Sequence, residues 1–301
     1  MNPPAARQTL SQRLPPVTHP DKVFWPTEGY TKLDLANFYD AIFPHLAPFV
    51  KDRLLSLERC PDGMRGECFY QREAPREMPP GTRTKRVRDE KGFTHYVVGG
   101  TRATQRTLVN LGCIAVHVWS SRAQDPSRPD WVCFDLDPTS GEFGDAARAG
   151  LLVKQGLDAL EVVSYPKTSG SRGLHVFVPI RVGPDVKVVL DFTETFGRRL
   201  AAAHPQDLTV EPHLSARRGR VYLDPFRNAF AQTVVAPYSV RRRPQAPVST
   251  PLAWSEVSPT LVPSDFNLGT FATRIKSHRP WKDFFQHRQS LEAVLKKVQR
   301  L

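Results

Sequence analysis

The chain has 301 residues, of which 40% are hydrophobic, so it can bury the core of one large domain or two small ones. Its formal net charge of +12 favours a polyanionic partner, such as nucleic acid or nucleotide phosphates. No stretch is apolar enough to span a membrane, and residues 1–16 lack the apolar core of a secretion signal. We therefore expect a cytoplasmic protein without membrane partners and with a flexible tail at residues 1–16.

The first half of the chain predicts two helices, two strands and one irregular segment. Thr31 and Asp34 are spaced as a capping box, and apolar residues recur after them at helical spacing. The polar segment 61–92, rich in Pro, Gly and Arg, predicts an irregular excursion over the surface. The stretches 94–98 and 114–119 have strand character, and a helical pattern at 105–111 separates them.

The second half alternates strand and helix patterns. Strands are expected at 131–136, 162–165, 174–180 and 221–223. Helices are expected at 143–155, 186–203 and 281–301, and the proline-rich segment 236–263 is expected to be an extended arm. This mixture predicts an α+β fold with residues 17–301 in a single domain.

The cysteines are too sparse to form a disulfide framework in a chain of this length. Cys60, Cys68, Cys113 and Cys133 include no CxxC pair. We therefore expect reduced thiols and no structural zinc.

Acidic residues stand where predicted strands end. Asp135 and Asp137 are two residues apart, so a strand places both carboxylates on one face, where they repel unless cations neutralise them. An isolated Asp-x-Asp is more often a solvated strand end in which each Asp caps a turn. Asp224, followed by Pro225, repeats the pattern. Together with the neighbouring motifs, the three form a candidate metal site.

Residues 167–175 combine a flexible backbone, hydroxyls and cationic side chains between two predicted strands, which suits a triphosphate. The spacing is not that of a nucleoside-triphosphatase P-loop, and a simple hairpin turn is the alternative. His175 follows Gly173 on the same strand face, and it could reach a phosphate, as could His117. Each histidine alone would more often belong to the core or the surface.

Aromatic and basic residues suggest contacts with nucleic acid. Phe69 and Tyr70 interrupt a polar segment and could stack on bases, or could instead anchor the loop in the core. Lys22 and Lys32 are ordinary surface lysines unless an anion binds near the first turn of the predicted helix. The arginines near Asp224 in sequence form a solvated face or hold phosphates, namely Arg217, Arg218, Arg220, Arg241, Arg242 and Arg243.

In their order and spacing these segments resemble the polymerase domain of bacterial ligase D, a member of the archaeo-eukaryotic primase superfamily, from about residue 21 to residue 254. The resemblance is carried by Pro20-Asp21-Lys22-Val23, Tyr30-Thr31-Lys32-Leu33-Asp34, Phe134-Asp135-Leu136-Asp137-Pro138, residues 167–176, residues 219–228 and Tyr238-Ser239-Val240-Arg241. It implies a primase-like fold with mixed sheets and an RRM-like catalytic subdomain flanked by helices. Residues 17–110 would bind the DNA end and template, 111–260 would be catalytic, and 261–301 would form a helical closing segment.

The resemblance also implies roles for individual residues. Two divalent metal ions, preferably Mn²⁺ and possibly Mg²⁺ in its place, would be bound by Asp135, Asp137 and Asp224. The ribo- or deoxynucleoside triphosphate would be bound by His117, Lys167, Ser169, Arg172, His175, Ser239 and Arg241. The DNA 5′-phosphate would be bound by His19, Lys22 and Lys32, and template bases would stack on Phe69 and Tyr70.

The activity implied is a template-dependent primase-polymerase that prefers ribonucleotides and extends primers at short gaps or breaks in double-stranded DNA. It would act as a monomer beside a DNA ligase and an end-binding protein. The chain departs from the family pattern at His19, Tyr70 and Ser171-Arg172, which replace Asn, Phe and Gly-Lys. Two other functions stay open: a DNA-end-binding scaffold without catalysis, and a metal-dependent nuclease, against which the glycine-rich cradle argues.

Overall fold

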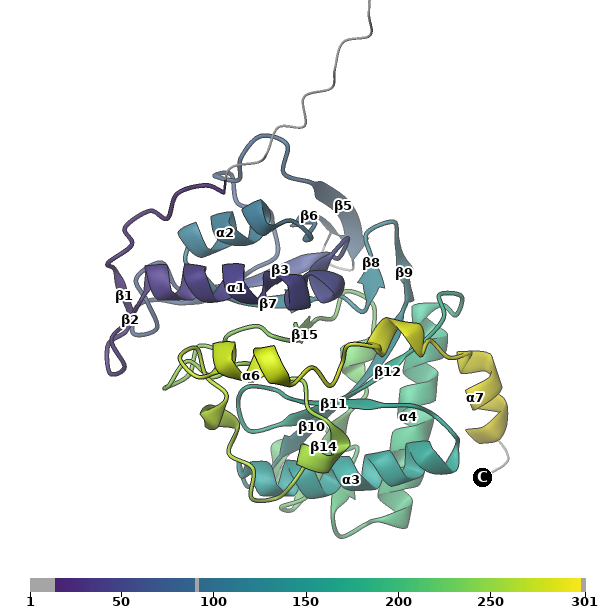
Figure 1. Ribbon diagram of the computed structural model, residues 1–301. Coiled ribbons are helices and arrows are strands. Elements are labelled where there is room, and N and C mark those ends of the chain that lie inside the picture. The colour runs from purple at the N-terminus through teal and green to yellow at the C-terminus, as the bar shows by residue number, and fades with distance from the viewer. Residues whose placement is uncertain (1–13, 90–91, 299–301) are drawn as a thin grey trace, which may run out of the picture.

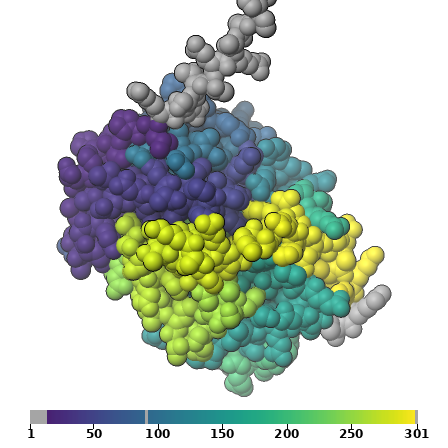
Figure 2. Space-filling model, in the orientation of Figure 1, coloured from purple at the N-terminus to yellow at the C-terminus, as the bar shows by residue number. Residues whose placement is uncertain are grey.

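The computed structural model describes residues 14–89 and 92–298 (Figure 1). The predicted tail at residues 1–16 lies outside this range, except for residues 14–16. Two β-sheets are each covered by helices, and the C-terminal segment lies across the seam between the two halves (Figures 1 and 2). The predicted α+β class is confirmed. Among the helices described, none has the length and apolar character needed to cross a membrane.

The first sheet has five strands in the order β11-β12-β10-β14-β13. They are β10 (Trp131–Pro138), β11 (Tyr165–Thr168), β12 (Leu174–Pro179), β13 (Leu208–Thr209) and β14 (Val221–Asp224). Only β13 and β14 pair in parallel. Helices α3 (Phe143–Ala159) and α4 (Val186–Ala203) pack against one face.

Two predicted bounds in this region were wrong. The strand expected at 162–165 starts at Tyr165 instead, because residues 162–164 lead out of the helix. The helix expected to end at Gly156 continues through it. A Cβ at Gly156 would lie 3.0 Å from the Phe196 ring, so this glycine allows α3 and α4 to pack closely and does not end the helix.

Side chains of β10 alternate between two cores. Phe134 and Leu136 pack beneath α3 and α4, whereas Trp131 belongs to the core shared with the second sheet. By the same alternation, Asp135 and Asp137 lie on the face of Trp131. Both carboxylates therefore face the space between the two halves.

The second sheet has four antiparallel strands in the order β15-β7-β3-β4. They are β3 (Leu55–Arg59), β4 (Phe69–Gln71), β7 (Cys113–Val118) and β15 (Val234–Val235). Helices α1 (Lys32–Val50) and α2 (Arg102–Asn110) lie against this part of the molecule (Figure 1). The predicted capping box is confirmed, because Asp34 N donates to Thr31 Oγ1 and Thr31 N donates to Asp34 Oδ2.

The segment 61–92 is more regular than predicted. It contains β4, the strand β5 (Thr84–Asp89) and the start of β6 (Gly92–Val97), which pair as a hairpin. In β5 only Val87 is buried, so charged residues at the other positions hid the strand pattern. Two further pairs are β1 (Val23–Trp25) with β2 (Tyr30–Thr31), and β8 (Ser121–Arg122) with β9 (Asp125–Pro129).

A disulfide joins Cys60 and Cys68, which corrects the prediction of four reduced thiols. The antiparallel register pairs Arg59 with Phe69 and brings the adjoining cysteines to a Cα–Cα distance of 4.4 Å. Cysteine spacing alone could not show this, because it depends on how β3 pairs with β4. The other two cysteines are free and buried.

The C-terminal part contains short elements instead of the helix predicted at 281–301. Helices α5 (Leu214–Arg217), α6 (Phe271–Ser277) and α7 (Leu291–Val298) are joined by 3₁₀ turns at Phe226–Asn228, Trp254–Glu256, Pro263–Asp265 and Phe284–Gln286. Trp281 and Phe284 enter the main core with their rings stacked 5.0 Å apart. This close aromatic packing favours the tight turn at Phe284–Gln286. Residues 299–301 of the predicted helix lie outside the described range.

One buried ion pair links the two halves. Arg53, just before β3, bonds to the carboxylate of Asp130, just before β10, and both side chains are almost fully buried. The Arg53 guanidinium also lies 3.4 Å from the Trp131 ring centroid. The pair therefore holds the start of β10, and hence the acidic strand end, against the second sheet.

Candidate functional site

The three predicted acidic residues meet on one face of the first sheet, on its inner strands β10 and β14. Asp135 on β10 and Asp224 on β14 are direct register partners, and Asp137 lies two residues further along β10. The side chains of Asp135 and Asp224 are 10% and 9% exposed. Like charges that are so close and so little exposed to solvent repel strongly unless cations neutralise them.

Neighbouring hydrogen-bond donors compensate the three carboxylates unequally. Arg227 Nε lies 3.2 Å from both Asp135 Oδ2 and Asp224 Oδ2, and His175 Nε2 lies 3.2 Å from Asp135 Oδ1. Burial would raise the pKa of Asp135, but His175 and Arg227 outweigh it, and that pKa lies below its ordinary value. Burial raises the pKa of Asp224, and Arg227 offsets the rise only in part.

Asp137 has no ion pair among the residues described. Burial and the charge of Asp135 raise the pKa of Asp137 to about 7. Beside Asp135 and Asp224, a third negative charge on Asp137 is therefore disfavoured at neutral pH.

The donor set fits a hard divalent cation. Three carboxylates supply only oxygen ligands, which is the chemistry of Mg²⁺ and Mn²⁺. Within residues 14–89 and 92–298, however, no three acidic, His or Cys side chains are already gathered in metal-binding geometry. Arg227 instead contacts two of the carboxylates, and its contacts with them raise its own pKa against the effect of burial.

Arg227 was not among the predicted site residues. It follows Asp224 by three residues, and the 3₁₀ turn Phe226–Asn228 returns its side chain over the end of β14. Only the spacing of three from Asp224 could have indicated it.

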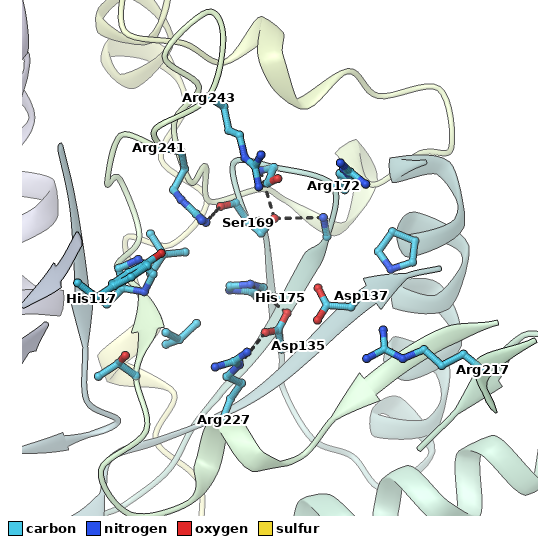
Figure 3. A pocket seen from close by; sticks show the side chains of 17 residues that line it. His117, Asp135, Asp137, Ser169, Arg172, His175, Arg217, Arg227, Arg241 and Arg243 are labelled. Carbon is cyan, nitrogen blue, oxygen red and sulfur yellow. Dashed lines mark hydrogen bonds and ion pairs between the residues drawn. The ribbon is translucent and has the colours of Figure 1, made fainter. Parts of the chain in front are cut away.

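A cavity of about 590 Å³ opens beside the carboxylates, and Arg227 lines it together with Arg217 and Arg243, two of the arginines predicted to hold phosphates. On the side away from Arg227, the backbone of residues 169–173 connects β11 to β12 (Figure 3). Ser169 Oγ accepts hydrogen bonds from Ser171 N and Gly173 N, and Ser169 O accepts one from Arg241 Nη1 at 2.7 Å. The basic side chains of Arg172 and Arg241 and the hydroxyl of Ser169 thus lie across the cavity from the carboxylates (Figure 3).

His117 and Tyr70 line the cavity from the second sheet. The ring centroid of Tyr70 lies 5.4 Å from that of His117 in an edge-to-face contact. His117 Nε2 is buried and has no hydrogen-bond partner within residues 14–89 and 92–298. Burial and then Arg241 lower the pKa of His117 far below its usual range, so the ring is neutral and can bond to a polar ligand.

Two residues predicted to bind nucleotide lie beneath the cavity and do not line it. The exposed fractions of Lys167 and Ser239 are 0%. Ser239 Oγ accepts a hydrogen bond from Val116 N and contacts Tyr39 OH, so it supports β7. Burial lowers the pKa of Lys167 to about 7, and burial together with Lys167 lowers that of His175 to about 4.

A family model for the LigD primase-polymerase domain matches residues 31–281. The chain belongs to this family.

Several LigD proteins are similar to the chain. The bifunctional non-homologous end joining protein LigD of Bacillus subtilis is 29% identical over 93% of this chain and 46% of its own length. The multifunctional LigD proteins of Pseudomonas aeruginosa and Mycolicibacterium smegmatis are 28% and 29% identical over 93% and 80% of this chain, and 34% and 32% of their own lengths. The chain thus spans about a third to a half of the length of these relatives.

A solved LigD domain has the same fold. The polymerase domain of Mycobacterium tuberculosis ligase D, in complex with DNA, superposes with a TM-score of 0.85 at 26% identity. The match covers 92% of this chain and 99% of that one.

In this LigD-family chain, the residues predicted to bind a 5′-phosphate lie together, away from the cavity. Lys32 N donates to Lys22 O, and Lys22 N donates to His19 O. Lys22 is paired with Asp62. Lys32 is buried, and its Nζ donates to Thr18 Oγ1 and Asn110 O, so Lys22 is the more accessible cation.

Phe69 and Tyr70, predicted to stack on template bases in a LigD domain, lie on the edge strand β4. They are 41% and 60% exposed. Both rings are therefore available to solvent, and the loop-anchor alternative has no support from their burial.

Proposed function

We propose that this chain is a template-dependent primase-polymerase that adds nucleotides to primer 3′ ends at short gaps or double-strand breaks. The observation that carries the proposal is the cavity lined by Asp135 and Asp137, with Asp224 paired beside Asp135, and by Ser169, Arg172 and Arg241 on the opposite side (Figure 3). Nucleotidyl transfer needs carboxylates beside the reacting phosphate and donors around the leaving phosphates. Membership of the LigD primase-polymerase family supports the same reaction.

We propose that Asp135, Asp137 and Asp224 would hold two divalent metal ions, preferably Mn²⁺. Bound there, the ions would neutralise the triphosphate and acidify the primer 3′-hydroxyl. Ser169, Arg172, His175 and Arg241 would bind the phosphates. His117 would offer its unpartnered Nε2 to the same nucleotide.

The DNA would be read on the second sheet and around α1. Phe69 and Tyr70 would stack on template bases, which is worth roughly 1–3 kcal/mol per base. Lys22 and Lys32, with His19, would bind the downstream 5′-phosphate and so measure the gap. The net charge of +12 favours such contacts with DNA.

Preference for ribonucleotides and cooperation with a separate ligase and end-binding protein complete the proposal. The proposal of these two protein partners is supported by the relatives, which are named as non-homologous end joining proteins.

Primer extension on a short gapped duplex tests this function. The assay compares Mn²⁺ with Mg²⁺, ribo- with deoxynucleotides, and a 5′-phosphate with a 5′-hydroxyl at the gap, using the wild type and Asp135→Ala. We expect Mn²⁺-dependent extension that the phosphate stimulates and that Asp135→Ala abolishes. Tight DNA binding without extension under every condition would replace the polymerase with the scaffold, and release of nucleotides would indicate a nuclease.

A further inference from the structure

A buried hydrogen-bond relay links Lys167, His175 and Asp135. Lys167 on β11 and His175 on β12 are register partners, and Lys167 Nζ lies 2.9 Å from His175 Nδ1. The other ring nitrogen, Nε2, lies 3.2 Å from Asp135 Oδ1. Lys167 is 0% exposed and does not line the cavity, whereas His175 and Asp135 do (Figure 3).

At the Lys167 end of this hydrogen-bond relay, the partners show that the amine donates. Lys167 Nζ lies 2.6 Å from Ser249 Oγ, and that hydroxyl lies 3.0 Å from Thr168 O. A carbonyl oxygen only accepts, so Ser249 donates its single hydrogen to Thr168 O and accepts one from Lys167. The amine is therefore oriented as a donor.

The Asp135 end defines the other direction. A carboxylate only accepts, so His175 must carry a hydrogen on Nε2 to bond to Asp135. A neutral imidazole with hydrogen on Nε2 has a lone pair on Nδ1, and this lone pair faces Lys167. Because an alkylamine binds a proton more tightly than an imidazole, the ammonium donates and the ring accepts.

We infer that Lys167 is a positioning residue, which fixes His175 as an Nε2–H donor and thereby orients the carboxylate of Asp135. Burying an ammonium is costly unless its hydrogens are bonded, and here Ser249 and His175 both accept. The protonated amine of Lys167 also places a positive charge beneath the carboxylates without lining the cavity. The catalytic meaning of this role depends on the proposed polymerase function, but the state of the His175 ring does not.

Nuclear magnetic resonance on ¹⁵N-histidine-labelled protein, without divalent metal ions, tests the inference. The nine histidines are resolved by long-range ¹⁵N–¹H correlation, and His175→Gln assigns the signal of His175. We expect the Nε2–H tautomer in the wild type and a mixture of tautomers in Lys167→Met. An Nδ1–H tautomer in the wild type overturns the inference, whether or not Lys167→Met folds.

Single-turnover primer extension then measures the consequence. We expect Lys167→Met to slow extension about 10- to 100-fold with little change in DNA affinity, as for other residues that orient a ligating side chain. Thr193→Val is the matched control, because Thr193 on α4 is equally buried and its hydroxyl donates to Leu190 O within its own helix, apart from the residues that line the cavity. Equal losses in both variants, or an unchanged tautomer in Lys167→Met, contradict the inference. If the tautomer changes but the wild type does not extend primers, the polymerase proposal fails and the positioning of His175 stands.

Discussion

Asp135 and Asp224 are register partners on adjacent antiparallel strands, and one guanidinium, that of Arg227, contacts both carboxylates. Two buried like charges side by side oppose folding. Such local conflict is expected where a site serves function at the cost of stability. This relationship gives the first prediction.

Asp224→Asn is expected to separate activity from stability. The amide oxygen can still accept from Phe226 N, while the repulsion with Asp135 is removed. We expect primer extension to fall by about 100-fold or more, because a carboxylate beside the reacting phosphate is lost. The melting temperature without divalent ions should stay constant or rise, because the raised pKa of Asp224 shows that the fold favours its neutral form.

The control for this variant is Asp191→Asn, an exposed carboxylate on α4 away from the cavity. Asp191→Asn should change neither primer extension nor the melting temperature. A marked drop in melting temperature for Asp224→Asn would show that the carboxylate is structural.

Asp62→Asn is expected to strengthen recognition of a 5′-phosphate. Asp62 is paired with Lys22, and a phosphate on Lys22 must compete with it. An exposed pair is worth about 0–1 kcal/mol, so its removal should tighten binding of a 5′-phosphorylated gap by up to about fivefold. Fluorescence anisotropy with gapped duplexes measures this, and the 5′-hydroxyl duplex should show a smaller change. An equal gain on both duplexes would mean that Asp62 acts only through overall charge.

The Cys60–Cys68 disulfide is expected to stabilise the strand that carries Phe69 and Tyr70. A loop this short corresponds to about 2–3 kcal/mol in the chain-entropy description. Chemical denaturation should show that loss when the wild type is reduced. In Cys60→Ser/Cys68→Ser, the reductant should have no further effect. Equal stability of the oxidised and reduced wild type would contradict the prediction.

The ion pair of Arg53 with Asp130 predicts a dependence of stability on pH. Burial would raise the pKa of Asp130, but Arg53 and Arg122 outweigh it and lower that pKa. A depressed carboxyl pKa stabilises the fold above the unfolded value of about 3.9, and the gain is lost as pH falls through the folded value. At pH 7 we expect Asp130→Asn to lower the free energy of unfolding by about 3–5 kcal/mol, because Arg53 stays buried without its counter-charge.

This deficit should shrink below about pH 4, because the unfolded wild type then binds a proton at Asp130 that the folded wild type, with its lower pKa, binds only at lower pH. Urea denaturation of the wild type and of Asp130→Asn between about pH 3 and about pH 7 measures this difference in the free energy of unfolding. A deficit that does not change with pH would show that packing, and not charge, accounts for the loss.

The sequence by itself determined those features that short windows encode. The period of two along β10 placed Asp135 and Asp137 on one face, and the helical pattern at 186–203 coincides with α4. The segment 167–175 was expected between two strands, and residues 169–173 of it connect β11 to β12. Each of these depends on neighbours in the chain, so periodicity and turn chemistry were sufficient.

The tertiary structure decided which distant residues meet. Strand order and register made Asp224 the partner of Asp135, buried Lys167 below His175, and brought Cys60 to Cys68. Residue types do not specify these contacts, because the same residues at other registers would lie on opposite faces or far apart. Packing of the whole core selects one register, and that selection turned separate motifs into one cavity.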